Sequence, residues 1–527
     1  MAPEEPIMEL EIYDTTLRDG SQQEGISLTV GDKLRIASLL DDLGVHYIEG
    51  GWPGANPKDD EFFSRAGNEL KLANAILVAF GSTRRAGVAV ASDPQLRALL
   101  DAETEFVCLV GKAWDYHVRE ALRTDLDEGL RMVSESIEYL RRHDRRVFFD
   151  AEHFFDGFYR GRDFAMAIAR AAAQAGAERL VLCDTNGGTL PGAAVEAIAS
   201  VQSELPGVAL GVHFHNDAGC AVASSLAAAS AGVRQIQGCI NGYGERTGNA
   251  DLCAVIPNLI LKMDRPVLPS DRLELLSPIA HHIAEVVNIA VDPHRPYVGS
   301  SAFTHKAGLH TSALARRPDA YEHTRPNAVG NRTRMVVSEL AGRAAIIRKA
   351  EELGFSLTEE QAREVLDQVK VLEHKGYHFE AADGSFELLV RRVLGWEQPF
   401  FVLESFRVFV ERPADEDVSA QATVKVVVDG ERVLTTGEGV GPVHALDQAL
   451  RSALRTAYPE VDSLRLTDYR VRVLDTSDGT GAVVRVLLET SSPEDAWDTI
   501  GVHNNIIEAS WEALVDGLVI GLMRAGR

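Results

Sequence analysis

The feature that most constrains the fold of this chain is the alternation of short apolar runs with longer helical segments over residues 10–263. Residues 32–43, 164–175 and 192–203 show helical periodicity, whereas the runs between such segments are short and rich in β-branched residues. Strands that alternate with helices form a parallel sheet, because each parallel strand needs a crossover connection. The expected strands are residues 10–13, 47–48, 75–80, 106–110, 147–149, 180–183, 209–212 and 235–240.

These eight units in about 250 residues predict a closed (β/α)8 TIM barrel. The alternative is an open, doubly wound sheet, which usually has fewer strands. In a barrel the chemistry lies where strands end and run into helices. The predicted strand ends are unusually polar, at residues 14–19, 49–51, 81–85, 150–153, 184–186, 213–217 and 241–246.

The pattern changes after the barrel, and we expect three domains. Residues 1–275 form the barrel, and residues 276–400 form a helical linker region with helices near 266–293, 335–353 and 358–373. Residues 401–527 contain alternating runs and two further helical segments, which predict a separate C-terminal α+β domain. The segment 297–330 is polar and rich in loops.

Composition excludes several classes of function. The 527 residues carry a net charge of −25, which argues against a nucleic acid or an anionic membrane as a partner. The N-terminus lacks an apolar signal region and no run of about 18 apolar residues occurs, so we expect a cytoplasmic enzyme. The five cysteines show no Cys-x-x-Cys spacing, which favours buried, reduced thiols over disulfides or metal ligands.

The seventh predicted strand ends in two histidines, His213 and His215. Side chains at i and i+2 of a strand point to the same face, so the two imidazoles offer nitrogen ligands at a fixed separation. Such a pair suits Zn, Mn or Fe, and with added carboxylate and water also Mg. Two hydrogen-bonded structural histidines are the alternative interpretation.

Asp19, at the end of the first strand unit, supplies a third ligand, because the first and seventh strands are near neighbours in a closed barrel. One carboxylate and two imidazoles form a facial set that leaves room for a chelating α-keto acid and water. Arg18 would stabilise the alkoxide that develops when a carbanion attacks the keto carbon. A rim ion pair is the alternative explanation of Arg18 and Asp19.

Several motifs resemble the acyl-CoA condensing enzymes that include isopropylmalate, homocitrate and citramalate synthases. They are residues 14–20 (Asp-Thr-Thr-Leu-Arg-Asp-Gly), 211–217 (Gly-Val-His-Phe-His-Asn-Asp) and 241–250 (Asn-Gly-Tyr-Gly-Glu-Arg-Thr-Gly-Asn-Ala). Residues 47–59 and 303–310 are similar, more narrowly, to the long citramalate synthase branch. The resemblance covers nearly the whole chain, and its final domain is similar to the regulatory domain of these synthases.

The resemblance implies roles for individual residues. Asp19, His213 and His215 would hold a divalent metal ion (Mg, Mn or Zn), with Asn249 as a further ligand or Asn241 nearby. Arg18, Thr185 and Tyr321 would bind the keto acid. Glu152 and His305 would transfer protons, and the sequence leaves open which of the two is the general base.

The resemblance further implies that acetyl-CoA condenses with pyruvate and water to give (R)-citramalate and CoA, an entry step to isoleucine biosynthesis. It implies a homodimer and feedback inhibition by isoleucine, with the loops at 437–442 and 475–481 as candidate effector contacts. Isopropylmalate or homocitrate synthesis, a metal-dependent acyl-CoA lyase and a non-catalytic sensor are the alternatives.

Two assignments have local competitors. Asp150, His153 and Asp156 lie close to Glu152 in sequence, and His305 is equally explained as a surface histidine in a basic loop. Coenzyme A carries several negative charges, so an acidic protein needs a local group of cations to bind it. The candidate cations are Arg295, Lys306, Arg316, Arg317, Arg325 and Arg332.

Overall fold

The computed structural model of the protein describes residues 10–305, 317, 321–335, 342–396, 400–412, 417–474, 481–493 and 495–526. The chain divides into two compact units, which are treated separately below. The first unit comprises Met1–Phe303 and Glu322–Arg332, and the second comprises Thr304–Tyr321 and Thr333–Arg527. Lys306, His310 and Arg316 lie outside the described residues, as do residues 413–416 and 475–480.

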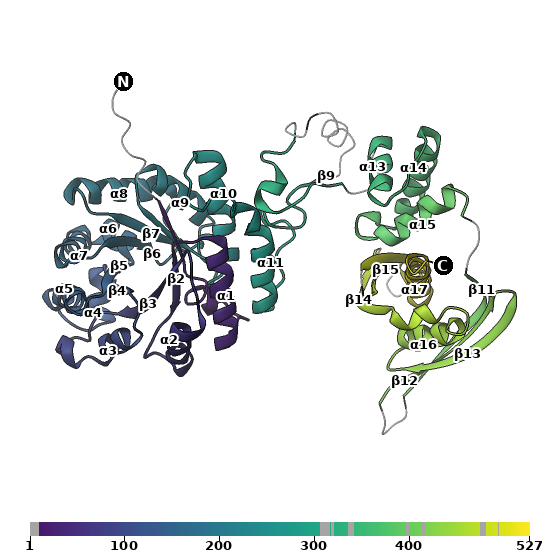
Figure 1. The fold of residues 1–527 in the computed structure, drawn as a ribbon, viewed down its shortest axis with the longest axis horizontal. Coiled ribbons are helices and arrows are strands. Elements are labelled where there is room, and N and C mark those ends of the chain that lie inside the picture. Colours follow the sequence, from purple (N-terminus) through teal and green to yellow (C-terminus); the bar gives the residue numbers. More distant parts are fainter. Residues whose placement is uncertain are drawn as a thin grey trace. The chain divides into compact units, whose positions relative to one another are not determined.

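The first unit contains a closed barrel of eight strands in the order of the sequence, which confirms the predicted fold (Figure 1). All neighbouring strands are parallel, and the barrel closes where β1 pairs with β8, with Asp14 opposite Gly238. Each predicted strand overlaps an observed one. The strands are β1 (Glu11–Asp14), β2 (Tyr47–Gly51), β3 (Ile76–Ser82), β4 (Phe106–Lys112), β5 (Arg146–Glu152), β6 (Arg179–Asp184), β7 (Leu210–Phe214) and β8 (Gln235–Gly238).

Helices surround the barrel and begin and end at residues suited to those positions (Figure 1). The Thr29 side chain accepts a hydrogen bond from the Asp32 amide in a capping box, and α1 ends at Gly44, whose φ is 89°. The helices are α1 (Val30–Leu43), α2 (Pro57–Glu69), α3 (Pro94–Asp101), α4 (Asp115–Glu120), α5 (Leu126–Arg142), α6 (Phe154–Arg160), α7 (Arg162–Ala175), α8 (Pro191–Glu204), α9 (Ala221–Ser230), α10 (Leu252–Met263) and α11 (Leu276–Val287).

Aromatic side chains fill the amino-terminal half of the barrel interior. The Phe148 ring lies 4.7 Å from Phe106 and 5.0 Å from Tyr47, measured between ring centroids, and Tyr13 packs edge-on against it. These four rings are buried, and Tyr47, Phe106 and Phe148 come from the first half of their strands. These rings therefore fill the barrel interior below the carboxyl ends of the strands.

A later segment returns to the barrel unit. Ser277 on α11 donates a hydrogen bond to the Val329 carbonyl at 2.7 Å, and Asn331 donates to the Tyr297 carbonyl at 2.8 Å. The His323 ring stacks on Phe303. Residues 322–332 are thus held to the barrel unit by contacts with residues that precede them in the chain.

The second unit combines helices with two three-stranded antiparallel sheets, as expected for a helical region and an α+β domain. Helix α16 packs on β12 and β13, and α17 packs on β15 and β16. Its helices are α13 (Arg343–Glu352), α14 (Glu359–His374), α15 (Asp383–Val393), α16 (Pro442–Leu454) and α17 (Ile506–Arg524). Its strands are β9 (Thr304–His305), β10 (Arg334–Met335), β11 (Phe401–Glu411), β12 (Ser419–Val428), β13 (Glu431–Gly439), β14 (Arg465–Val473), β15 (Val484–Ser491) and β16 (Ala496–His503).

The interpretation of residues 437–442 as a loop is wrong for most of that segment. Gly437 and Gly439 belong to β13, and Pro442 begins α16. A Cβ atom at Gly437 would collide with the backbone of Ala449, and one at Gly439 would lie 2.7 Å from the Ala445 nitrogen. The glycines therefore allow the helix to approach the strand closely.

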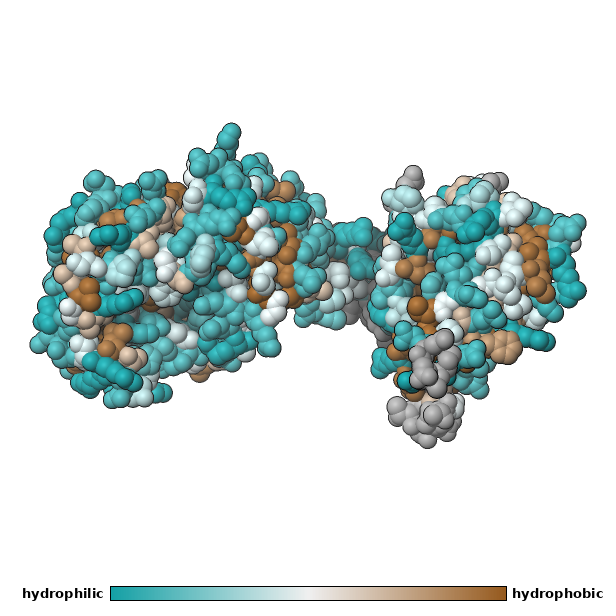
Figure 2. Space-filling model, turned by 90° about the horizontal axis from the view of Figure 1, so that it is seen from below, coloured by the Kyte–Doolittle hydropathy of each residue, from teal (hydrophilic) through white to brown (hydrophobic). Residues whose placement is uncertain are grey.

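On the face shown in Figure 2 most residues are hydrophilic, and the apolar residues form separate small patches. Within the described residues, none of the helices combines the length and the hydrophobicity needed to cross a membrane.

All five cysteines are free; Cys220 is partly buried and the others are buried. Reduced thiols were expected from their spacing.

Candidate active site

A cavity of about 310 Å³ opens at the carboxyl ends of the barrel strands. The structure brings Arg18, Asp19, Glu152, Thr185, His213 and His215 together in its wall, although they come from the carboxyl ends of four strands, β1, β5, β6 and β7, or from the loops after them. The remaining lining residues are Gln22, Trp52, Phe80, Ser82, Thr83, Val110, Gly111, Lys112, Leu122, Asp150, Cys183, Glu245 and Arg246.

Asp19, His213 and His215 form a candidate metal site at the floor of this cavity. One Asp19 carboxylate oxygen lies 3.4 Å from the His213 Nε2 and 3.7 Å from the His215 Nε2. The three side chains are buried, and their potential ligand atoms lie within 4.8 Å of one another. A carboxylate and two imidazoles suit a first-row divalent cation.

Asn249 completes the surroundings of this triad. Its amide nitrogen donates to Asp19 at 3.2 Å and to the Tyr243 carbonyl at 3.0 Å. Its side-chain oxygen is buried and has no hydrogen-bond partner among the described residues. A buried oxygen without a partner is unusual, and a cation would satisfy it. Asn241, the other candidate, instead donates to the Ala280 carbonyl at 2.8 Å and belongs to the core.

The electrostatics of the triad favour a cation. Burial would raise the pKa of Asp19, but the Arg18 guanidinium and the two imidazoles hold it well below its usual range. Burial lowers the pKa of His213, but the hydrogen bond and the charge of Asp19 outweigh this effect and raise it to about 9. Burial and the charge of His213 lower the pKa of His215 to about 4. A neutral His215 and an ionised Asp19 are the forms that bind metal, whereas His213 would release a proton when a metal ion binds.

Arg18 is held from three sides. Its Nε donates to Glu49, one of its terminal nitrogens lies 3.3 Å from Asp19, and its guanidinium carbon lies 3.8 Å from the centroid of the Phe80 ring. The fully buried Glu49 also accepts a hydrogen bond from the Tyr13 hydroxyl at 2.8 Å. The remaining guanidinium donors are therefore presented to the cavity in a fixed orientation.

Thr185 is fixed by the loops that follow neighbouring strands. Its hydroxyl oxygen accepts a hydrogen bond from the His153 amide at 2.9 Å, so its single proton remains available to the cavity. Its carbonyl accepts from Arg246 at 2.9 Å, and Arg246 also binds both carboxylate oxygens of Asp217. These bonds tie together the loops after β5, β6, β7 and β8.

Glu152, at the end of β5, forms an ion pair with Lys112 at the end of β4. Of its sequence neighbours, Asp150 is buried beneath it in the cavity wall, whereas His153 pairs with Asp156 at 3.1 Å. His153 and Asp156 do not line the cavity. Glu152 is therefore the accessible carboxylate at this position of the rim.

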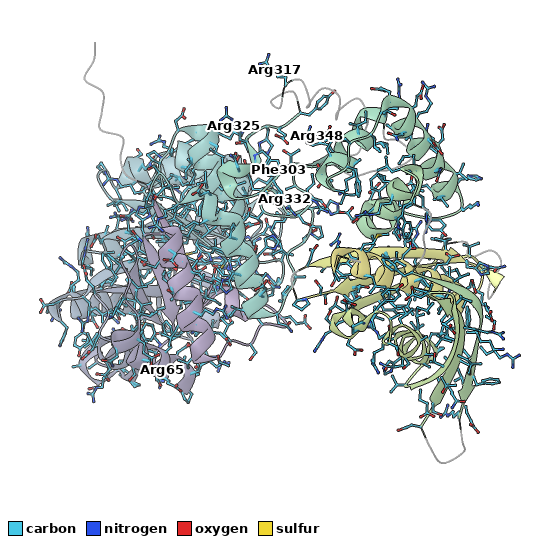
Figure 3. The ribbon with its side chains drawn as sticks, turned by 45° about the vertical axis from the view of Figure 1, so that its right-hand side comes forward. Arg65, Phe303, Arg317, Arg325, Arg332 and Arg348 are labelled. Atoms are coloured by element: carbon cyan, nitrogen blue, oxygen red, sulfur yellow. The ribbon has the colours of Figure 1, made fainter. Side chains whose placement is uncertain are left out.

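His305 lies on β9. Tyr321 is the last residue of the segment Thr304–Tyr321, so both residues belong to the second unit. Among the candidate cations, Arg295 forms an ion pair with Asp251 at 2.7 Å and supports the loop after β8. Arg325 and Arg332 are exposed and lie at the same end of the barrel unit as Phe303, far from Arg65 on α2 (Figure 3).

Comparison with known proteins agrees with this geometry. Residues 9–274 match the HMGL-like family, residues 297–377 the homocitrate synthase post-HMGL domain-like family, and residues 380–521 the LeuA allosteric (dimerisation) domain. The chain is 48% identical to (R)-citramalate synthase of Aquifex aeolicus, over 97% of this chain and 98% of that protein. It is 51% identical to the enzymes of the same name from Synechocystis sp. (97% of this chain, 96% of the relative) and Streptomyces coelicolor (98% and 97%).

The chain belongs to the (R)-citramalate synthase family. In this member of the citramalate synthase family, the whole candidate metal site lies within the HMGL-like match. His305 and Tyr321 lie within the post-HMGL match.

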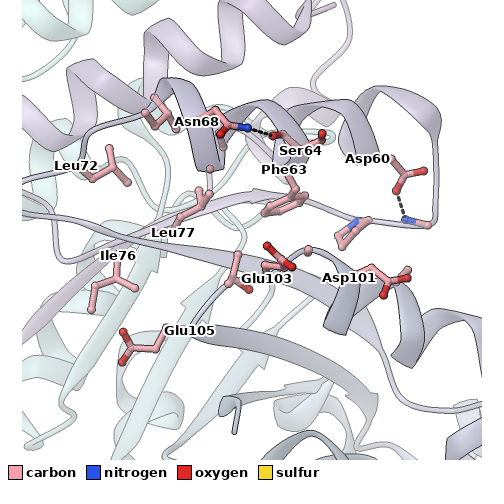
Figure 4. A pocket seen from close by; sticks show the side chains of 18 residues that line it. Asp60, Phe63, Ser64, Asn68, Leu72, Ile76, Leu77, Asp101, Glu103 and Glu105 are labelled. Atoms are coloured by element: carbon pink, nitrogen blue, oxygen red, sulfur yellow. Dashed lines mark hydrogen bonds between the residues drawn. The ribbon is translucent and has the colours of Figure 1, made fainter. Parts of the chain in front are cut away.

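A larger hollow of about 910 Å³ lies elsewhere on this citramalate synthase family member, on the outer side of the barrel between α2 and α3 (Figure 4). Asp60, Asp101, Glu103 and Glu105 line it, and neither lysine nor arginine does. Ile76 and Glu105 mark the amino-terminal ends of β3 and β4, opposite to the metal site. Its negative charge disfavours a phosphorylated ligand.

Two residues of the site were not assigned a role from the sequence. Glu49 orients Arg18, and Gln237 on β8 lies beside His213, with its side-chain oxygen 2.8 Å from the His213 Nδ1. Both side chains are fully buried polar groups. The signal that was available for Gln237 is a short strand, Gln235–Gly238, in which glutamines recur at i and i+2 and so share one face.

Proposed function

We propose that the protein condenses acetyl-CoA with pyruvate and water to give (R)-citramalate and CoA. The observation that carries the proposal is the cavity in which Arg18 adjoins the Asp19, His213 and His215 triad, in a chain similar to (R)-citramalate synthases over nearly its full length. We further propose that this reaction is an entry step to isoleucine biosynthesis.

The keto acid would bind through three groups of the cavity. A divalent metal ion such as Mg, Mn or Zn, held by Asp19, His213 and His215 with Asn249 as a further ligand, would act as a Lewis acid on the keto group. Arg18 would donate to the keto oxygen and stabilise the negative charge that develops there. Thr185 would donate its hydroxyl proton to the carboxylate.

The lining of the cavity favours pyruvate over a dicarboxylic keto acid. Trp52, Phe80 and Val110 contribute apolar side chains to the lining, which suit a methyl group. The cations Lys112 and Arg246, which also line the cavity, are paired with Glu152 and Asp217. The second carboxylate of 2-oxoglutarate would require one of these ion pairs to be broken.

His305 and Glu152 would move the protons. His305 would remove a proton from the acetyl methyl group, and the resulting carbanion would form the carbon–carbon bond to the keto carbon. The proton taken up by His305 would then pass by way of the Glu152 carboxylate to the alkoxide. Water would then cleave the thioester and release CoA. Tyr321 would contact the substrate from the same segment as His305, and Arg325 and Arg332 would bind phosphates of coenzyme A.

We further propose a homodimer regulated by isoleucine. The match of residues 380–521 to the LeuA allosteric (dimerisation) domain supports both the assembly and a regulatory role. We place the regulatory domain at 401–527, the barrel at 1–275 and the helical linker at 276–400. Light scattering of the purified protein tests the dimer, and inhibition by isoleucine but not by leucine tests the effector.

Release of free thiol from acetyl-CoA tests the reaction. With Mn²⁺ present, pyruvate should support thiol release, and 2-oxoisovalerate and 2-oxoglutarate should support much less. A preference for 2-oxoisovalerate would replace the proposal by isopropylmalate synthesis, and one for 2-oxoglutarate by homocitrate synthesis. Cleavage of an acyl-CoA without any condensation would show a lyase.

A further inference from the structure

Gln237 lies next to the candidate metal site but does not belong to the ligand set. Strands β7 and β8 pair in parallel with His213 opposite Gln237, so the two side chains point to the same side of the barrel wall. The Gln237 side chain is fully buried, and its Oε1 lies 2.8 Å from the His213 Nδ1.

The direction of this hydrogen bond follows from the other contacts of the Gln237 amide. Its nitrogen donates to Asp150 at 3.1 Å and, more weakly, to the Gln235 Oε1 at 3.5 Å. A reversed amide would set its oxygen against these two oxygens. The Oε1 therefore faces His213 and accepts the Nδ1 proton.

This arrangement fixes the tautomer of the histidine. When the Nδ1 of a neutral imidazole carries the proton, the lone pair is on Nε2. The His213 Nε2 is the atom that lies 3.4 Å from Asp19, on the side of the candidate metal site. No hydrogen-bond partner of the His215 Nδ1 occurs among the described residues, so the second imidazole lacks a comparable support.

We infer that Gln237, held by Asp150, is a positioning residue that presents the His213 Nε2 lone pair to a divalent cation. The inference rests on the metal site of the proposed function and adds to it a support from β8. Residues that orient ligands in this way typically change metal affinity roughly 10- to 100-fold when they are lost.

The test is Mn²⁺ binding to the full-length protein, measured from the electron paramagnetic resonance signal of free Mn²⁺. Gln237→Met removes the acceptor at similar volume and should weaken Mn²⁺ binding roughly 10- to 100-fold. Gln235→Met is the matched control, because Gln235 lies on the same face of β8 and holds the Gln237 amide only through the weaker contact at 3.5 Å, so it should lower the affinity far less than Gln237→Met does. Equal affinity in Gln237→Met and the wild type, or equal losses in both variants, would overturn the inference.

A double variant covers the case in which Gln237→Met does not fold. Asp150→Asn combined with Gln237→Glu exchanges the carboxylate and the amide, so position 237 still accepts from His213 and position 150 donates to position 237. This variant should retain wild-type Mn²⁺ affinity, whereas Gln237→Glu alone should not, because two carboxylates would then face each other. Weak Mn²⁺ binding by the double variant contradicts the inference.

Asp19→Ala separates this inference from the proposal on which it rests. If wild-type protein binds Mn²⁺ and Asp19→Ala does not, the metal site stands, and the Gln237 variants then test the positioning role alone. If Asp19→Ala binds Mn²⁺ as the wild type does, both the metal site and the role of Gln237 fail.

Discussion

Arg18 and Glu49 form a buried ion pair in which the Arg18 Nε donates to a Glu49 carboxylate oxygen at 2.5 Å. Glu49 is fully buried, while Arg18 reaches from this pair into the cavity. The pair places the guanidinium that we assign to the keto oxygen, so a change at Glu49 should act on catalysis through Arg18.

Glu49→Gln should destabilise the protein by about 3 kcal/mol, because a buried cation loses its partner. It should also lower kcat/KM for pyruvate roughly 100-fold, since a small displacement of Arg18 misaligns the charge stabilisation. Thermal unfolding and thiol release measure the two effects. Glu69→Gln removes an exposed partner of Arg65 and serves as the control, with no change expected in either measurement (Figure 3). Unaltered kcat/KM in Glu49→Gln would remove the role given to the ion pair.

Thr185→Val should raise the KM for pyruvate roughly 10- to 100-fold, the effect of losing a hydrogen bond to a charged group. The KM for acetyl-CoA should change little, because the hydroxyl is assigned to the keto acid alone. Thr185→Ser keeps the hydroxyl that accepts from the His153 amide and should behave as the wild type. Initial rates with each substrate varied in turn measure both constants, and an equal rise in both would contradict the assignment.

Removal of metal by a chelator should abolish thiol release and lower the unfolding temperature. Restored Mn²⁺ should reverse both effects, because a ligand at about 100 times its Kd stabilises the folded state by about 2.7 kcal/mol. Differential scanning calorimetry with and without Mn²⁺ measures the shift. Asp19→Ala should show no shift, and a shift of wild-type size in that variant would exclude Asp19 as a ligand.

Asp516 on α17 should make the second unit less stable as the pH rises. Burial raises the pKa of Asp516 to about 6, although Ser385 donates a hydrogen bond to it at 2.8 Å. A carboxyl group with a raised pKa contributes its stability below its unfolded pKa of about 4 and loses it as the pH rises to about 6.

Asp516→Asn should therefore stabilise the protein by about 2 kcal/mol at pH 8, where the wild-type carboxyl is charged. At pH 4 the two proteins should unfold at similar temperatures, because the carboxyl is then largely neutral. Calorimetry at the two pH values tests this, and a stabilisation of equal size at both would show an effect unrelated to ionisation.

The barrel could be predicted because its strands and helices differ in length and periodicity. The predicted end of the eighth strand is wrong, because this strand was expected to reach residue 240 but β8 ends at Gly238. Asn241 has a φ of 58° in the turn that follows. In the second unit β13 was not recognised, because its sequence is polar and contains two glycines. Its partners, β12 and α16, are its neighbours in the chain, so the available signal was the Asp429-Gly430 pair between β12 and β13, which is typical of a hairpin turn.

Only part of the candidate site could be predicted from the sequence, because the rest depends on which residues face each other across the strands. Asp19, His213 and His215 converge because each lies at or just after the carboxyl end of a barrel strand, and these strand ends share one rim. The roles of Glu49 and Gln237 depend on which residues face each other across neighbouring strands, and this register is not visible in one sequence. His305 and Tyr321 belong to another unit, and their proposed roles remain to be tested.

The hydrogen bonds around Thr185 join the loops after four successive strands, from His153 through Thr185 to Arg246 and Asp217. Loops tied in this way cannot open one at a time, because opening one breaks the bonds that hold its neighbours. This side of the rim should act as one cooperative unit, whose amides exchange with solvent together and slow down together when a keto acid binds. The substrate would then be held by a single event of closing, rather than by the separate ordering of four loops.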